Sequence, residues 1–328
     1  MKNIFVFAVF VTVGLSTAAQ SQEQKLLVAY STFASGPAAL WVAKDAGFAK
    51  KNGLDLGLIY IGGSGIMTQA VVSGTVPVAV GGGTAAMTGK LAGIDLVITA
   101  SLLHQPALRY LVVKKEIARP EQLKGKKLGI SRFGSSSEVL LNIALRKIGL
   151  DPQRDVSILQ VGNAPLRVGA LKTGSIDGTL MSDGEKVLTD EAGFPVLFDL
   201  VDLGIEALQA DVITSRGFIR SNGDAVRALT KALVEAFHFG KTRKKETLEI
   251  LSRYMKTSDP RVLEAAYTSS ITIGPSKPYP TLKGVEVALA ELAVRNPKAA
   301  SAKPEEFVDM SLIADLDRSG FIDSLYRR

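Results

Sequence analysis

The sequence predicts an α/β protein of two lobes, each built on a mixed, mostly parallel sheet flanked by helices. Short β-like runs alternate with helical patterns from Gln24 onward, as in parallel sheets whose faces are covered by helices. The alternation restarts near Lys127, and several short motifs recur 100 residues apart. At 328 residues the chain is also long enough for two lobes of ordinary size.

The first residues predict a secretory signal peptide over residues 1–22. Met1 to Asn3 is a short positive start, Ile4 to Leu15 is apolar, and Ser16 to Ala19 is small enough for cleavage. The apolar run is short for a membrane span, although an uncleaved anchor helix is the alternative. No second apolar run is long enough to span a bilayer, so we expect a soluble mature chain.

The amino-acid composition indicates the cellular compartment and the classes of partner to expect. The absence of cysteine excludes disulfides, thiolate chemistry and a bacterial lipoprotein anchor. A secreted chain without an anchor fits a Gram-negative periplasm, with secretion into the medium as the weaker alternative. The net charge of +7 comes from scattered basic residues, and aromatic residues make up only 6%. We therefore expect no nucleic-acid partner, while a preference for anionic ligands stays open.

The first lobe is expected to begin with a strand over Leu26–Tyr30. A helix should follow over Pro37–Lys51, because proline suits a first helical turn and Gly53 suits the stop. Gly74 should end the next helix in the same way. The elements expected after Lys51 are a strand over 54–61, a helix over 66–72, a strand over 76–80, a helix over 84–91 and a strand over 96–101.

The second lobe is expected to begin with a strand over Lys127–Ser131. Ser135 and Glu138 have the spacing of a capping box and should open a helix with apolar residues at helical intervals. The pattern continues with a strand over 156–161, a helix over 166–172 and a strand over 176–181.

Three motifs support a common architecture for the lobes. Each first-lobe motif has a counterpart 100 residues later: Ser31–Ser35 with Ser131–Ser135, Ile61–Ser64 with Val161–Ala164, and Ser73–Val76 with Thr173–Ile176. Chance matches among glycine and serine are easy, so the agreement in spacing carries the inference.

The C-terminal part should be largely helical and pack back on the first lobe. We expect a strand over Val212–Ile219 and a long helix from Ser221, with breaks near Pro260 and residues 275–280. The chain should cross between lobes near 108–113 and 212–218. Lobe one would then comprise residues 23–110 and 213–328, and lobe two residues 111–212.

The candidate ligand site lies at the carboxyl ends of the strands, where ligands bind in open α/β sheets. These positions are rich in small polar residues that precede helices, whose N-terminal N–H groups favour anions. Each residue alone is more often a helix cap than a ligand contact, so the hypothesis rests on recurrence in both lobes. The candidates are Thr32, Phe33, Ser35, Gly62, Gly63, Ser64, Gly83, Thr84, Arg132, Ser135, Ser136, Asn163, Ser182 and Asp183.

Three larger side chains could add to this site. Arg132 could pair with an anionic ligand or be a surface arginine. Phe33 and Trp41 could stack on a flat ligand, although the helical pattern around Trp41 favours the core or the cleft wall. No catalytic set is present: His104 and His238 stand apart, and Gly81–Gly83 is not followed by the Lys-Ser/Thr of a phosphate loop. We expect no catalytic residue, metal or cofactor.

Three segments resemble periplasmic proteins for sulfonate, taurine and nitrate uptake. They are Leu40–Leu54 (LWVAKDAGFAKKNGL), Arg119–Ile130 (RPEQLKGKKLGI) and Leu171–Gly178 (LKTGSIDG), and the likeness covers most of residues 26–219. The resemblance implies a type II periplasmic binding fold and delivery of a solute to an ABC importer. It extends to fungal thiamine-pyrimidine synthases, which are enzymes, but their cysteine-rich motif is absent from this chain.

We therefore expect a non-enzymatic periplasmic protein that captures a small polar or anionic organic solute. Sulfonate-, nitrate- or pyrimidine-like solutes all fit the resemblance. The partners would be that solute and an inner-membrane ABC permease, with the protein itself a monomer. Two alternatives remain: a secreted enzyme on the same scaffold, and a sensor that presents its ligand to a membrane receptor.

Overall fold

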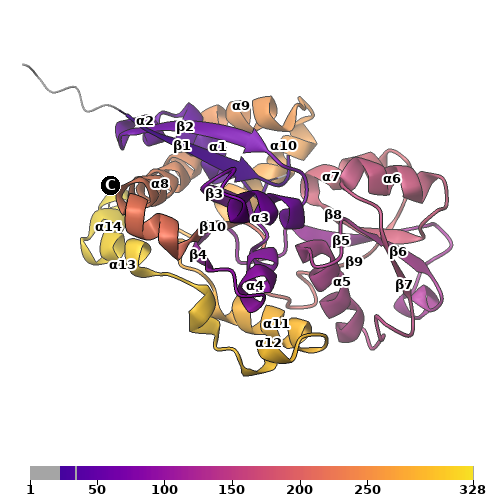
Figure 1. Cartoon of the computed structure of the whole chain (residues 1–328). Coiled ribbons are helices and arrows are strands. Elements are labelled where there is room, and N and C mark those ends of the chain that lie inside the picture. The colour runs from indigo at the N-terminus through magenta and orange to yellow at the C-terminus, as the bar shows by residue number, and fades with distance from the viewer. Residues whose placement is uncertain (1–22, 34, 328) are drawn as a thin grey trace, which may run out of the picture.

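The computed structural model describes residues 23–33 and 35–327, so the predicted signal peptide lies outside the described residues. Two lobes lie side by side, each built on one five-stranded sheet with helices packed on its faces (Figure 1). The predicted fold class is confirmed. None of the helices in this part of the chain combines the length and the hydropathy needed to cross a membrane.

The first sheet is mixed and mostly parallel. Strand β1 pairs in parallel with β2 and β3, whereas β10 runs antiparallel to β3 and β4. From edge to edge the strands are β2 (Leu54–Tyr60), β1 (Gln24–Tyr30), β3 (Val78–Gly81), β10 (Asp211–Ser215) and β4 (Leu96–Ser101).

The second sheet repeats this arrangement strand for strand. Strand β6 pairs in parallel with β7 and β8, and β5 runs antiparallel to β8 and β9. The order is β7 (Ser157–Gln160), β6 (Lys127–Ile130), β8 (Gly178–Ser182), β5 (Leu108–Val113) and β9 (Val196–Asp199). The lobes therefore share one topology, as the recurring motifs predict.

Hydrogen bonds at the recurring motifs match between the lobes. The Ile61 N–H donates to the carbonyl oxygen of Tyr30 at 2.9 Å, and the Val161 N–H donates to Ile130 at the same distance. Both residues in the second pair lie 100 positions after those in the first. The recurrence in sequence thus reflects one turn built twice, directly after β2 in the first lobe and directly after β7 in the second.

Helices flank both sheets and make up most of the C-terminal part. The first lobe carries α1 (Ala38–Asp45), α2 (Phe48–Lys51), α3 (Ser64–Val72) and α4 (Gly83–Leu91). The second carries η1 (Pro120–Leu123), α5 (Ser136–Lys147), α6 (Ala164–Lys172) and α7 (Asp183–Asp190). The C-terminal part comprises α8 (Arg216–Thr242), α9 (Lys244–Met255), α10 (Pro260–Tyr267), η2 (Thr268–Thr272), α11 (Leu282–Ala293), α12 (Pro297–Ser301), η3 (Pro304–Phe307), α13 (Ser311–Arg318) and α14 (Phe321–Tyr326).

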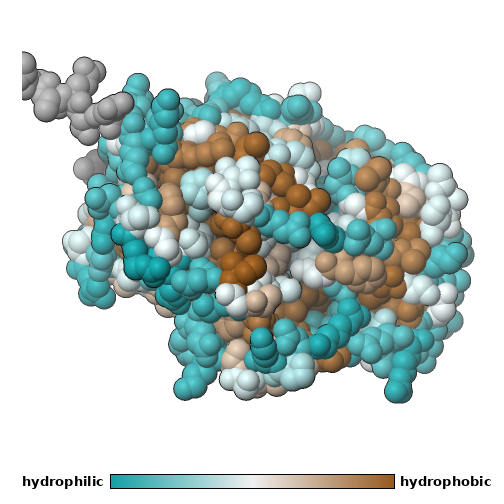
Figure 2. All heavy atoms as spheres, viewed as in Figure 1, coloured by the Kyte–Doolittle hydropathy of each residue, from teal (hydrophilic) through white to brown (hydrophobic). Residues whose placement is uncertain are grey.

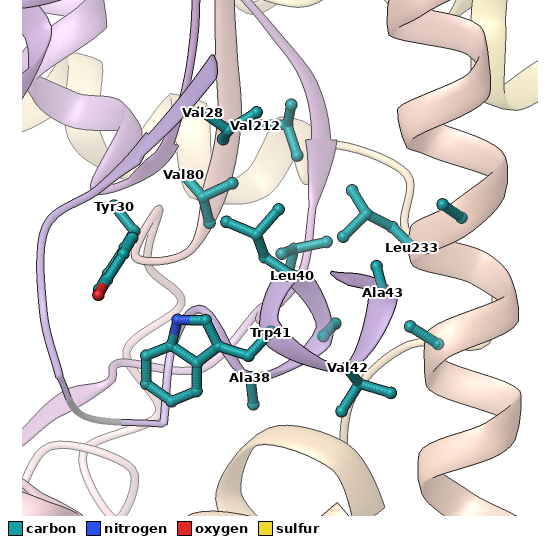
Figure 3. Packing of buried hydrophobic residues seen from close by; sticks show 14 of the residues in the cluster. Val28, Tyr30, Ala38, Leu40, Trp41, Val42, Ala43, Val80, Val212 and Leu233 are labelled. Carbon is teal, nitrogen blue, oxygen red and sulfur yellow. The ribbon is translucent and has the colours of Figure 1, made fainter. Parts of the chain in front are cut away.

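The core of the first lobe ties the C-terminal helices to the first sheet. Leu40 and Trp41 of α1 are fully buried against Val80 and Val212 of the sheet and Leu233 of α8 (Figure 3). Removing such side chains from water is the main favourable term in folding. Helix α8 therefore packs on the first sheet.

The C-terminal part also contacts the second lobe. Arg146 of α5 donates to the carboxylate of Glu291 in α11 at 2.9 Å, and Arg295 donates to Glu138 of α5 at 2.7 Å. Both carboxylates are largely buried, so these ion pairs are less screened by solvent than exposed ones. Helix α11 thus braces the two lobes, a contact that the sequence did not indicate.

Three predicted elements have markedly different limits in the structure. The strand expected over Val212–Ile219 ends at Ser215, whose hydroxyl accepts from the Phe218 N–H at 3.0 Å and caps α8. The helix start expected at Ser221 instead falls at a kink, where Asn222 has φ −138°. The single helix expected over residues 37–51 divides at Gly47, whose φ of +80° ends α1.

The crossings between lobes also differ from the prediction. Residues 108–113 form β5, which pairs wholly within the second sheet, and 211–215 form β10 of the first sheet. We therefore propose that the crossings are the segments 102–107 and 200–210, just outside these strands. The lobe limits at 110 and 212 would then move by a few residues at each end.

Candidate ligand-binding cleft

A cleft of about 580 Å³ lies between the two lobes and is lined by both of them and by residues 255–262. Apolar atoms gather on both lobes beside the boundary between them (Figure 2). The predicted site residues that line this cleft are Thr32, Phe33, Gly63, Ser64, Ser136, Asn163 and Ser182. Half of the predicted set therefore comes together in one concave site of the size that holds small organic ligands.

Helix N-termini from both lobes open on this cleft. The Ser136 N–H, at the start of α5, donates to the hydroxyl of Ser64, at the start of α3, at 3.3 Å. In the second lobe, Asn163 caps α6 through the Leu166 N–H at 3.3 Å, and Ser182 caps α7. The positive ends of these helices favour negative charge in the cleft.

Arg167 of α6 also lines the cleft, although it was not among the residues predicted for the site. Its guanidinium is buried, with 3% of the residue exposed, and donates to the carbonyl oxygens of Gly162 at 3.0 Å and Leu180 at 3.2 Å. The carboxylate of Glu185 lies 3.9 Å away. The Nε–H of Arg167 has no hydrogen-bond partner in the protein.

This environment leaves a buried cation incompletely compensated. Burial lowers the pKa of Arg167, while Glu185 and Tyr60 oppose that shift. An arginine keeps its charge even so, because its ordinary pKa is far above neutrality. A buried cation with an unpartnered donor gains most from an oxyanion, which supplies both opposite charge and acceptors.

Aromatic rings line the first-lobe side. Phe33 stacks on Tyr60 with the ring centres 4.0 Å apart. Burial and Glu185 raise the pKa of the Tyr60 hydroxyl, and Arg167 opposes them, so the hydroxyl stays protonated and able to donate. Trp41, considered as a stacking residue, is instead fully buried and stacks on Tyr254 with the ring centres 5.0 Å apart. It belongs to the core.

Residues 36–244 match the NMT1/THI5-like family. The chain belongs to this family. It is 30% identical over 229 residues to the taurine-binding periplasmic protein of Escherichia coli (strain K12), covering 66% of this chain and 67% of the relative.

Two solved structures extend the comparison. A Bordetella bronchiseptica RB50 protein has a TM-score of 0.77 at 24% identity, over 91% of this chain and 98% of that one. The periplasmic aliphatic sulphonate binding protein SsuA of Escherichia coli has a TM-score of 0.70 at 20% identity, over 88% and 92%. These likenesses support the two-lobed binding-protein fold, and the resemblance predicted from the sequence is confirmed.

In this NMT1/THI5-like chain, the start of α4 is closed to a ligand. The Gly83 N–H donates to the buried carboxylate of Asp211 at 3.0 Å, and Ser101 donates to the same carboxylate at 2.5 Å. Gly83 and Thr84, predicted as ligand contacts, therefore lie outside the cleft lining, and the Gly83 N–H at the helix start is already satisfied by an internal carboxyl group.

Two further first-lobe candidates also lie outside the cleft lining. Ser35 is fully buried, and its hydroxyl accepts from Ser269 at 3.2 Å. Gly62 lies beneath the Tyr60 hydroxyl, where an added Cβ would come within 2.8 Å of that oxygen. Gly62 thus makes room for Tyr60 rather than lining the site.

The remaining second-lobe candidates bond within the protein. Ser135 is buried and donates to the carbonyl oxygen of Arg132 at 2.6 Å, so it does not form the expected capping box with Glu138. Asp183 accepts from the Tyr110 hydroxyl at 2.9 Å. Arg132 is near the first lobe, with Nη1 3.5 Å from the side-chain oxygen of Gln69. None of these side chains is among those that line the cleft.

The two histidines take structural positions away from the cleft. His104 Nε2 lies 3.1 Å from the carbonyl oxygen of Tyr279, and the His238 ring packs edge-on against Tyr326. Over residues 23–33 and 35–327, no cluster of three or more histidine, aspartate or glutamate residues could hold a metal ion.

Gly82 allows the two lobes to approach each other closely. An added Cβ there would lie 1.8 Å from Ser136 Oγ and 2.7 Å from Ser136 Cβ, across the boundary between lobes. Rotation of the serine hydroxyl would relieve the first clash but not the second. With φ −67° and ψ 111°, however, Gly82 has a backbone conformation that alanine adopts freely.

We expect Gly82→Ala to fold normally but to hold the lobes apart. Its affinity for a bound solute should fall about tenfold, because binding then includes the cost of closure against the clash. Small-angle scattering should give a larger radius of gyration in the presence of ligand. Gly169→Ala, where an added Cβ meets nothing within 4 Å, is the matched control; equal scattering curves and affinities for the two variants would contradict this role.

Proposed function

We propose that this protein is a periplasmic solute-binding protein that captures a small polar or anionic organic solute and delivers it to an ABC permease. The observation that carries the proposal is Arg167, a buried cation in the cleft with an N–H donor unpartnered in the protein. Relatives named for taurine and aliphatic sulphonate binding support an oxyanion as the recognised group.

The groups around Arg167 suit capture without chemistry. The Asn163 side chain and the helix N-termini at Ser64 and Ser136 add donors and positive potential from both lobes. Micromolar binding requires about −8 kcal/mol, which a few charge-assisted hydrogen bonds and buried apolar contacts supply. Because the donors come from both lobes, the solute itself stabilises their approach.

Mass spectrometry of any solute that co-purifies with the protein, after its release by unfolding, tests the proposal. A calorimetric screen of sulfonates, nitrate, aromatic acids and pyrimidines follows. We expect at least one anion to bind with a stoichiometry near one and to be recovered unchanged. Recovery of a chemically converted compound would favour a secreted enzyme, and the absence of binding by any anion would refute the proposal.

Delivery to a permease is supported by two exposed apolar residues at matched positions. Ile66 is 48% exposed in the first turn of α3, and Leu166 is 58% exposed in the first turn of α6, 100 residues later. Both lie within two residues of cleft-lining residues, on opposite lobes. Two equivalent apolar contacts beside the cleft suit a membrane partner that has two equivalent halves.

We expect the double variant Ile66→Asp, Leu166→Asp to bind solute normally but to support uptake about tenfold more slowly, because charge replaces apolar anchor residues. Uptake of the identified solute into cells checks this. Val72→Asp, at the far end of α3 and 43% exposed, is the control. Normal uptake by the double variant would contradict docking beside the cleft and would favour a sensor role.

The protein is expected to be a monomer, which analytical ultracentrifugation measures.

A further inference from the structure

We infer that the solute is an oxyanion carried on a planar aromatic ring, either a carboxylate or a sulfonate, rather than a short aliphatic anion. The inference rests on the proposed function and specifies the chemical class of its ligand. Three features of the cleft carry it: its volume, the placement of its charges, and a stacked pair of aromatic rings in the lining that Arg167 shares.

The volume exceeds what a small anion fills. The cleft encloses about 580 Å³, whereas a water molecule occupies about 30 Å³ of the liquid, so an anion of four or five heavy atoms would leave most of the cleft to solvent. Much of the wall is apolar, including Leu188, Met255 and Val262. Water held against apolar walls is unfavourable, so the cleft favours a ligand with a sizeable apolar part.

The charged residues of the cleft lining favour one position for the anionic group of the solute. Besides Arg167, the lining carries the carboxylates of Glu185, Glu191 and Asp259 and the ammonium group of Lys256, which is exposed to solvent. Asp259 is paired with Arg261 at 2.7 Å, and Glu185 accepts from the Ser182 N–H at 3.2 Å. Like charge repels an anion from Glu191 and Asp259, and solvent screens the exposed charge of Lys256. Glu185 lies 3.9 Å from Nη2 of Arg167, whereas Nε of the same guanidinium has no partner in the protein, so the oxyanion belongs at Nε and the remainder of the solute extends away from it.

A pair of stacked aromatic rings lines the same cleft. Tyr60 lines it from the first lobe, and Arg167 lines it from the second. The Tyr60 ring stacks on Phe33, which is still 37% exposed and faces the cleft. Lys256 Nζ lies 5.9 Å from the centre of the Phe33 ring. A third planar ring placed against this pair would gain both stacking and burial.

Calorimetry with paired probes tests the inference: naphthalene-2-sulfonate with ethanesulfonate, and 2-naphthoate with propionate. Within each pair the headgroup is shared and only the ring differs, and comparison of the pairs distinguishes sulfonate from carboxylate. We expect the aromatic member of the preferred pair to bind at least about tenfold more tightly. Phe33→Leu should lose about that factor for the aromatic probe and leave the aliphatic one unchanged. Phe33→Tyr, which keeps the ring, should retain it.

Phe133→Leu is the matched control, because Phe133 occupies the equivalent position of the second lobe and lies outside the cleft lining. Equal affinities for aromatic and aliphatic probes, or equal losses in the Phe33→Leu and Phe133→Leu variants, would overturn the inference while leaving anion capture intact. If neither pair bound while another anion of the screen did, the inference would fail and the proposed function would stand.

Discussion

Replacing Arg167 by glutamine is expected to lower the affinity of the cleft for its anionic solute by about 30-fold or more. Removing one partner of a desolvated ion pair typically costs about 2–5 kcal/mol, because the other charge is left buried and unpaired. Glutamine keeps a hydrogen-bonding head but has no charge and a shorter reach. Isothermal calorimetry with the solute identified by mass spectrometry measures the loss directly.

The control for this variant is Arg132→Gln. Arg132 also lies near the boundary between lobes, but it is outside the cleft lining, so its removal should change affinity little. Losing Arg167 also leaves the carbonyl oxygens of Gly162 and Leu180 without their donors, so the variant should melt at a lower temperature. Binding is therefore measured well below that melt. Equal affinity losses for the two variants would contradict the assignment of the anion to Arg167.

The fold was predictable because its signals are local and repeated. Alternating strands and helices indicate the layers, and the turn at Ile61–Ser64 recurs at Val161–Ala164 with the same hydrogen bond to the preceding strand. What local patterns could not give was the point where a strand becomes a helix when a single residue decides it. The Ser215 hydroxyl caps α8, so the strand ends there. The β-branched residues just before Ser215 favour a strand, and the sequence pattern gives no sign of where that strand stops.

The site was predictable where it consists of loops and hidden where it consists of a buried side chain. Arg167 lies in an ordinary helical pattern, and its burial depends on Gly162 and on Leu180 of β8. One signal could have found it. The equivalent residue of the first lobe is Met67, which is fully buried in the core. An arginine in the second lobe, at the position where the first lobe has a buried methionine, indicates that this position serves more than core packing.

Gly83 and Thr84 illustrate the opposite error. Their position after β3 and at the start of α4 satisfies the same pattern as Ser64 or Ser136. Asp211, 128 residues later in the chain, occupies that helix end because β10 is inserted beside β3 in the sheet. Strand pairing between distant segments therefore decides which helix N-termini remain accessible to a ligand. Local sequence patterns do not reveal such pairing.

Asp211 leads to the second large expected effect, on stability. Burial raises the pKa of its carboxyl group to about 7, although the hydrogen bonds from Ser101 and from the Gly83 N–H oppose the shift. The folded chain therefore keeps this proton up to about neutral pH, whereas the unfolded chain releases it near pH 4. The free energy of unfolding falls as pH rises between these values, because the folded state binds more protons.

We expect Asp211→Asn to be more stable than the original protein above pH 7, by up to about 4 kcal/mol, and to lose that advantage toward pH 4. The asparagine oxygen can accept from Gly83, and its amide can donate to the Ser101 hydroxyl, so the hydrogen bonds survive without a buried charge. Urea unfolding of both proteins between pH 4 and pH 8 measures the difference.

Asp177→Asn provides a control of opposite sign. Burial alone would raise the pKa of Asp177, but hydrogen bonds from Lys114 and from the Lys127 N–H outweigh it and hold that pKa below its usual value. This variant should therefore be less stable than the original protein at neutral pH and approach it in acid. A stability difference for Asp211→Asn that did not change with pH would show that Asp211 is ionised throughout, and that α4 is capped by a permanent internal anion.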